Sequence, residues 1–227
     1  TAIRAVLLID AQIDHVTGLF MLREHRQPLD VWCTDPARED LESGNPVFRL
    51  LGHYSGVVPR RIPLGGEVFM IPAVPGLAFA AHALTSNAPP YSPRRDRPVP
   101  GDNIGLEVTD LSSGRQLFYA PGLCEIDTAV ADAMQRADCV LVDGTCWRDD
   151  ELIALGISKK RARDMGHRPL DGDGGMLALL AGLPGSTRKV LIHINNTNPI
   201  LDEDSAEHRR VRDAGVEIAH DGLEITL

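Results

Sequence analysis

Short apolar runs separated by Gly, Pro, Asp and Asn mark out the elements of the first part of the chain. Residues 4–10 (RAVLLID) have the near-continuous apolar character of a buried strand, and residues 30–34 (DVWCT) predict a second strand. Residues 17–24 (TGLFMLRE) predict a short helix between them. The next helix (DPAREDLES) is expected to begin with Asp35 as its N-cap and Pro36 at its first position.

The pattern then changes from hairpins to a regular alternation of strands and helices. Residues 57–83 have the pattern of strands interrupted by Pro and Gly, and residues 103–122 predict a β-hairpin that turns at Ser113 and Gly114. Helices are expected at residues 128–137, 174–183 and 204–215, and strands at residues 138–144, 188–196, 216–220 and 223–227. This order predicts an α/β fold of two sheets between helices, an αββα sandwich, in a single domain over residues 1–227.

Composition and charge exclude several classes of function. The 227 residues are 43% hydrophobic, which is enough for one sizeable core. A formal net charge of −9 argues against binding to nucleic acid or to an anionic membrane surface. The four cysteines form no CxxC pair, which favours reduced, buried thiols in a cytoplasmic protein. The chain opens on a strand without an initiator Met, so we expect native residues upstream of Thr1.

Three predicted strands end on metal-ligand residue types, in the stretches VLLID-AQIDH, CVLVD-GT and VLIH-INN. Sites in α/β sheets lie at the carboxyl ends of strands, so these side chains are expected to converge. Each has an alternative reading: Asp14 as a helix cap, Asp143 as a turn former and His193 as a core histidine. A single bound ion explains all three endings together.

These residues carry a resemblance to the metallo-β-lactamase superfamily. The stretch DAQIDH resembles the superfamily's HxHxDH motif, with Asp10 and Gln12 in place of its first two histidines and with Asp14 and His15 kept. The stretch LVDGT falls where the superfamily has its bridging aspartate, and LIHINNTNP where it has its last histidine. The resemblance implies the αββα sandwich of that superfamily, without its first strands in this chain.

A longer series of motifs resembles one family of that superfamily, the PqqB proteins of pyrroloquinoline quinone (PQQ) biosynthesis. It comprises LIDAQIDHVTGL, SNAPPYSPRRDRP, LFYAPGL, LVDGT, DMGH and LIHINNTNPI and extends over the whole chain. The family's N-terminal part, with a cysteine cluster that binds structural zinc, is absent here, so no structural zinc is expected.

The resemblance implies which residues hold the metal. Asp14, His15 and His193 complete one ligand set, and Asp143 lies between the two metal positions as a catalytic residue. Two imidazoles and one carboxylate form the ligand set of non-haem Fe(II) sites, and catalytic Zn(II) uses the same residue types. Ligand identity therefore leaves the metal open, and the resemblance favours Fe(II).

The other ligand set has lost both motif histidines, and Asp10 and Gln12 are its expected remnant. We therefore expect a second ion to bind weakly or not at all. Hydrolases of the superfamily rely on a hydroxide activated between two metals, so plain hydrolysis becomes the less favoured reading.

The resemblance implies a hydroxylase that uses iron and O2 on the tyrosine-derived ring of a peptide-derived Glu-Tyr precursor. Its partners would be this small-molecule precursor of PQQ and O2, and a homodimer is left open. A metal-dependent hydrolase is the first alternative. A non-catalytic carrier or transport factor for PQQ or its precursor is the second.

Two further groups of side chains are expected at the site. His167 is expected to move protons, a task that suits histidine at neutral pH, with an exposed loop histidine as the alternative. Arg94, Arg95 and Arg97 lie in a proline-rich loop and could bind substrate carboxylates, and Tyr91 could stack on the substrate ring. The alternative for this loop is a solvated surface segment.

Overall fold

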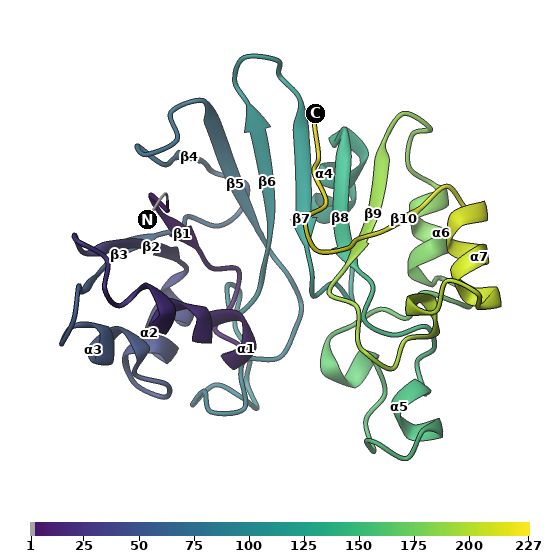
Figure 1. Ribbon diagram of the computed structural model, residues 1–227, viewed down its shortest axis with the longest axis horizontal. Helices are drawn as coiled ribbons and strands as arrows, with labels where there is room; N and C mark the ends of the chain where they lie inside the picture. Colours follow the sequence, from purple (N-terminus) through teal and green to yellow (C-terminus); the bar gives the residue numbers. More distant parts are fainter. Residues whose placement is uncertain (1–2) are drawn as a thin grey trace. The chain divides into compact units, whose positions relative to one another are not determined.

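The computed structural model of the chain describes residues 3–227 (Figure 1). The chain divides into two compact units, one up to Leu106 and one from Glu107 onward. Each unit has its own elements and is described by itself. The expectation of a single domain over the whole chain stays a prediction.

The first unit is built on a parallel sheet in the order β1-β2-β3. Its strands are β1 (Val6–Leu7), β2 (Leu29–Cys33) and β3 (Val57–Arg61). Its helices are α1 (Ile13–Val16), the 3-10 helix η1 (Thr17–Leu22), α2 (Asp35–Glu42) and α3 (Val47–Leu51). A strand, helix, strand order of this kind is what places helices over a parallel sheet.

Alternation along β2 separates the two faces of this sheet. Leu29, Val31 and Cys33 are buried in one core with residues of the helices, among them Val16, Leu19, Leu41, Val47 and Leu51. Trp32 stacks instead on Phe69, with ring centroids 5.5 Å apart, and Phe69 stacks on Phe79 at 5.6 Å. These two phenylalanines belong to the antiparallel strands β4 (Val68–Met70) and β5 (Leu77–Ala83).

The second unit contains a parallel sheet whose order is β7-β8-β9-β10. Its strands are β7 (Gln116–Ala120), β8 (Cys139–Asp143), β9 (Arg188–Ile192) and β10 (Glu217–Ile218), and β6 (Ile104–Asp110) runs through the division between the units. Its helices are α4 (Thr128–Arg136), α5 (Glu151–Ala154), α6 (Met176–Ala181) and α7 (Ala206–Asp213), with the 3-10 helices η2 (Arg163–Met165) and η3 (Pro199–Leu201). The teal-to-yellow part of Figure 1 shows β7, β8 and β9 side by side.

Several predicted boundaries need correction. The N-cap of α2 is Thr34, whose hydroxyl accepts from Ala37 N, and not Asp35. The first strand ends at Leu7 because the chain then changes partner and Asp10 forms a bridge with Asn103. Residues 223–227 are not a strand. A turn that includes Gly222, with φ 82°, precedes them and takes the chain off the sheet.

Candidate metal centre

Two neighbouring strands of the second unit end at one edge of the sheet, and polar side chains follow there. Asp143 is the last residue of β8, and its register partner Ile192 is the last residue of β9. His193 comes next in the chain. The structure thus brings Asp143 and His193 to the same carboxyl edge, where sites of α/β sheets lie.

The carboxylate of Asp143 is fully buried and accepts four hydrogen bonds. Oδ1 accepts from the backbone N of Thr145 at 2.9 Å and from its hydroxyl at 2.6 Å. Oδ2 accepts from Leu123 N at 3.0 Å and from Nδ1 of His167 at 2.8 Å. An ionised carboxylate has no proton to donate, so Nδ1 of His167 carries the proton and Nε2 carries the lone pair.

His167 and His193 stack on each other, with ring centroids 5.2 Å apart. Together with Asp143 they offer one ligand atom each within 4.8 Å of one another. Two imidazoles and a carboxylate suit Zn(II) or Fe(II) by residue type. An ion that recruited Asp143 would have to displace one of the donors that now bind its oxygens, so the two imidazoles are the better fit.

The backbone at His193 has an unusual conformation. With φ 54° it is the one non-glycine residue at positive φ among residues 3–227. Left-handed backbone costs an L-residue roughly 1–2 kcal/mol and is often retained at functional sites. It also explains why β9 ends at Ile192 and not at residue 196. Next to it, a Cβ on Gly144 would lie 3.0 Å from Ile192 O, a tight contact, so this close crossing favours glycine.

In the first unit, Asp10 and His15 form a second carboxylate–imidazole pair. Nδ1 of His15 lies 2.8 Å from Oδ1 and 3.0 Å from Oδ2 of Asp10, which is buried at 2% exposure. The hydrogen bond that His15 donates to Asp10 raises the pKa of His15 above its usual range, although burial acts in the opposite direction. The sequence predicted Asp10 as a remnant metal ligand, and in this structure its carboxylate orients His15.

The other two members of this motif lie on the surface side of the same turn. Gln12 is the N-cap residue of α1, and its backbone N donates to Oδ1 of Asp10 at 3.0 Å. The side chain of Asp14 is 79% exposed, and its Oδ2 lies 3.7 Å from Nε2 of His15. Asp14 and His15 are therefore adjacent as ligand groups within the first unit.

The proline-rich loop of the first unit holds Arg94 in a network of ion pairs. Its guanidinium lies 2.9 Å from Asp40 Oδ1 and 3.2 Å from Asp102 Oδ1, and both of these carboxylates are 1% exposed. It also donates to Pro36 O at 2.8 Å. These contacts hold the loop on α2. A substrate-binding role of Arg94 stays a prediction.

The other predicted substrate-binding residues of this loop have different surroundings. Arg95 donates to Ala88 O, and the hydroxyl of Tyr91 donates to Ala11 O. Burial raises the pKa of Tyr91 to about 12, so the phenol stays protonated. Arg97 is exposed. Their roles toward a substrate also stay predictions.

Comparison with known proteins decides the family. A model described as a beta-lactamase superfamily domain matches residues 1–194. Coenzyme PQQ synthesis protein B of Azoarcus sp. (strain BH72) is 66% identical over all of this chain and 74% of the relative, and that of Methylococcus capsulatus is 58% identical with the same coverage. The chain belongs to the coenzyme PQQ synthesis protein B family.

Solved structures agree with this assignment. The crystal structure of Zn²⁺-bound PqqB from Methylobacterium extorquens is 31% identical, covers 99% of this chain and 73% of that chain, and matches with a TM-score of 0.86. A diphosphatase of the PhnP family matches with a TM-score of 0.64 at 16% identity, which shows the fold alone. The metallo-β-lactamase fold predicted from the motifs is therefore confirmed, and this fold supports a metal-dependent enzyme. None of the helices in residues 3–227 is both long and apolar enough to span a membrane.

The metal ligand set predicted for this family member draws on both units. Asp14 and His15 belong to the first unit, and His193 belongs to the second. The set stays a prediction for that reason. What the second unit shows by itself is the arrangement of Asp143, His167 and His193.

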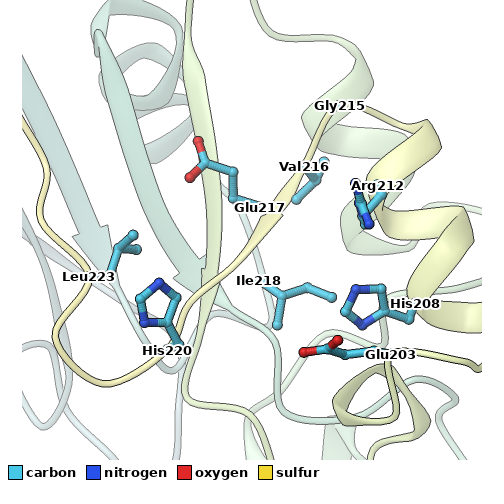
Figure 2. A pocket seen from close by; sticks show the side chains of 9 residues that line it. All are labelled: Glu203, His208, Arg212, Gly215, Val216, Glu217, Ile218, His220 and Leu223. Atoms are coloured by element: carbon cyan, nitrogen blue, oxygen red, sulfur yellow. The ribbon is translucent and has the colours of Figure 1, made fainter.

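Two pockets of similar size lie in the second unit. One, of about 560 Å³, is lined by residues of the range 203–223, and Figure 2 shows His208 beside Glu203, with His220 on the other side of Ile218. The other, of about 550 Å³, is lined partly by residues of the loops that follow Asp143 and His193. Several residues that line this second pocket follow Asp143 or His193 closely in the sequence, whereas those of the first pocket belong to the C-terminal segment.

Sequence reasoning missed the residues that hold these loops. Glu151 is 5% exposed, and its carboxylate accepts from Trp147 N at 2.6 Å and from the Thr197 hydroxyl at 2.7 Å. It thereby links the loop after β8 to the loop after β9. Thr145 was also missed, although the stretch LVDGT was noted. A hydroxyl two residues after a strand-end aspartate was the available signal.

Proposed function

We propose that this chain acts in PQQ biosynthesis as a metal-dependent hydroxylase of the tyrosine-derived ring in a peptide-derived Glu-Tyr precursor, with Fe(II) and O2. Family membership supports the pathway. The observation that carries the chemistry is the Asp143–His167 pair, which lies against His193 in the second unit. It combines a proton-transfer group with a metal-ligand group at one sheet edge.

The proposed ligands are Asp14, His15 and His193, the set implied by the family resemblance. These residues would hold an iron ion through two imidazoles and a carboxylate, and the ion would supply O2 activation when bound. The crystal structure of the M. extorquens relative contains Zn²⁺, which supports metal binding and does not decide which metal this chain binds.

The proposed role of His167 follows from its hydrogen bonding. Its Nδ1–H donates to Asp143, so Nε2 is the atom that can accept a proton from the phenol hydroxyl of the substrate. Asp143 then stabilises the imidazolium that forms, because the carboxylate is buried where charges interact more strongly than in water. The proposed contacts of the substrate carboxylates and ring are Arg94, Arg95, Arg97 and Tyr91.

The test is a measurement of metal content and oxygen use. Anaerobic titration of the native protein with Fe(II) should give one equivalent per chain, and O2 consumption should require both iron and the precursor. His193→Ala should abolish O2 consumption. His208→Ala, a histidine of the C-terminal pocket, should leave it unchanged.

A metal-dependent hydrolase is the second candidate, and the zinc in the M. extorquens relative favours it. It predicts two zinc ions per chain and hydrolytic turnover without O2. That result would overturn the hydroxylase proposal.

A further inference from the structure

The hydroxyl of Thr145 is the centre of the hydrogen-bond network in the second unit. Its Oγ1 lies 2.6 Å from Oδ1 of Asp143, 2.8 Å from Nδ1 of His193 and 2.9 Å from the carbonyl oxygen of His193. Nδ1 of His167 lies 3.1 Å away. One side chain thus contacts all three members of the candidate metal group.

Counting protons assigns the direction of the hydrogen bond between Thr145 and the ring of His193. A threonine hydroxyl has one proton to donate and two lone pairs to accept with. Oδ1 of Asp143 and the carbonyl oxygen of His193 can both only accept, so the single hydroxyl proton goes to one of these two oxygens, and the 2.6 Å contact to Asp143 is the shorter. In either case Oγ1 has no proton left for the ring and is an acceptor toward Nδ1 of His193. Nδ1 of His193 must therefore carry its proton, which leaves the ring's lone pair on Nε2.

We propose that Thr145 is a positioning residue that fixes His193 in the Nδ1–H tautomer and so presents Nε2 as the metal-binding atom. The proposal rests on the proposed function only in taking His193 as a metal ligand. A metal-bound imidazole needs its other nitrogen held by an acceptor, and a hydroxyl backed by a carboxylate meets that need.

The backbone around Thr145 is built to keep the hydroxyl in place. Thr145 N donates to Asp143, and Thr145 O accepts from Asn195 N at 3.2 Å. The amide of Asn198, which is 2% exposed, donates to Gly144 O at 2.9 Å. These bonds join the turn after β8 to the turn after β9. They keep the turn that contains His193 next to Thr145, where the hydroxyl contacts both the ring and the carbonyl of that histidine.

The test compares variants that keep or remove the hydroxyl. Thr145→Val and Thr145→Ala remove it, and Thr145→Ser keeps it. Imidazole ¹⁵N shifts of the metal-free protein report the tautomer, and anaerobic competition with a chelator reports the Fe(II) dissociation constant. We expect the Val and Ala variants to show a mixed tautomer at His193 and about 10- to 100-fold weaker Fe(II) binding. The Ser variant should stay within about threefold of the wild type.

Thr187→Val is the matched control. Thr187 directly precedes β9 and is buried to a degree similar to Thr145. Its hydroxyl donates to Ala137 O at 3.0 Å. This variant should lose stability without changing the tautomer of His193 or the Fe(II) dissociation constant.

If Thr145→Val does not fold, the Thr145→Ala variant decides between the outcomes. Wild-type tautomer and affinity in the Ala variant, or a Ser variant as impaired as Val, would overturn the proposal. Neither readout needs O2 or substrate, so a failure of hydroxylation alone would leave it standing.

Discussion

Nδ1 of His167 lies 2.8 Å from Oδ2 of Asp143, whose side chain has no exposed surface. Three further protein donors bind the same carboxylate. Within the second unit, Asp143 therefore orients a histidine as well as offering a ligand atom. The superfamily resemblance implied a catalytic residue between two metal positions and did not indicate the hydrogen bond to His167.

Asp143→Asn should impair both activity and stability. Each carboxylate oxygen faces N–H or O–H donors, so the new NH₂ group meets a donor whichever way the amide is turned. We expect turnover to fall about 10²- to 10⁴-fold. The free energy of unfolding should fall by about 1–3 kcal/mol. Steady-state O2 consumption and urea unfolding measure the two effects.

Asp150→Asn is the control, because that side chain is 52% exposed. It should change stability by less than about 0.5 kcal/mol. Wild-type turnover in the Asp143 variant would contradict the assigned role of this aspartate.

Asp10→Ala should weaken the metal site without emptying it. Asp10 holds Nδ1 of His15, and loss of such a carboxylate typically lowers metal affinity about 10- to 100-fold. Iron content at saturating Fe(II) should stay near one equivalent, whereas His15→Ala should lose it. Complete metal loss in Asp10→Ala would show that Asp10 is itself a ligand.

Arg94→Ala should destabilise the protein far more than Arg97→Ala. Removing Arg94 leaves Asp40 and Asp102 buried without their counter-charge, which should cost about 3–5 kcal/mol in urea unfolding. Burial already raises the pKa of Asp40, and loss of Arg94 should raise it further. Arg97 is exposed, so Arg97→Ala should change stability by less than about 0.5 kcal/mol.

A rise in KM for the precursor in Arg97→Ala, at unchanged stability, would support carboxylate binding by this loop. Equal stability of the two arginine variants would contradict the ion-pair network.

Sequence patterns predicted the central strands well. β2 and β8 fall within one residue of their expected bounds, because apolar runs of that length leave little choice of register. Asp127 caps α4 as the pattern indicated, since its side chain accepts from Val130 N. The first and last strands, β1 and β10, were predicted too long, because their few pairings depend on segments that are distant in the sequence.

The sequence indicated which residue types gather at the candidate site, but not the hydrogen bonds that join them. Strand-end polar residues indicated Asp143 and His193, but hydrogen bonds between separate loops cannot be deduced from spacing. Thr145 and Glu151 act through such bonds. The partner of His167 was found only in the structure, because 24 residues separate it from Asp143.

Stability should depend on pH through Asp171 and Arg210. The hydrogen bond from Arg210, at 2.7 Å, lowers the pKa of Asp171. A lowered carboxyl pKa stabilises the fold above the unfolded-state value, about pH 4, and this contribution is lost as pH falls through the folded-state pKa. Asp171→Asn should thus cost under about 1 kcal/mol at pH 7, because the pair is partly exposed. The difference should vanish at lower pH. Urea unfolding at several pH values measures it, and a constant difference would contradict the ion pair.

The thiols should be unreactive in the folded protein. Burial raises the pKa of Cys33 and of Cys146 to about 12, and all four cysteines are buried and free. A thiol reagent at pH 8 should react slowly with the native protein and rapidly with four thiols after denaturation in urea. Fast labelling of one native thiol would contradict the burial of that residue.

The left-handed backbone at His193 limits how this protein could be re-engineered to prefer another metal. Asparagine and aspartate tolerate that conformation, whereas cysteine and glutamate pay a steric penalty before any coordination bond forms. In a combinatorial library at position 193, most variants would therefore be disfavoured by the backbone conformation before metal binding is selected. Softer thiolate ligands are better introduced elsewhere in the chain.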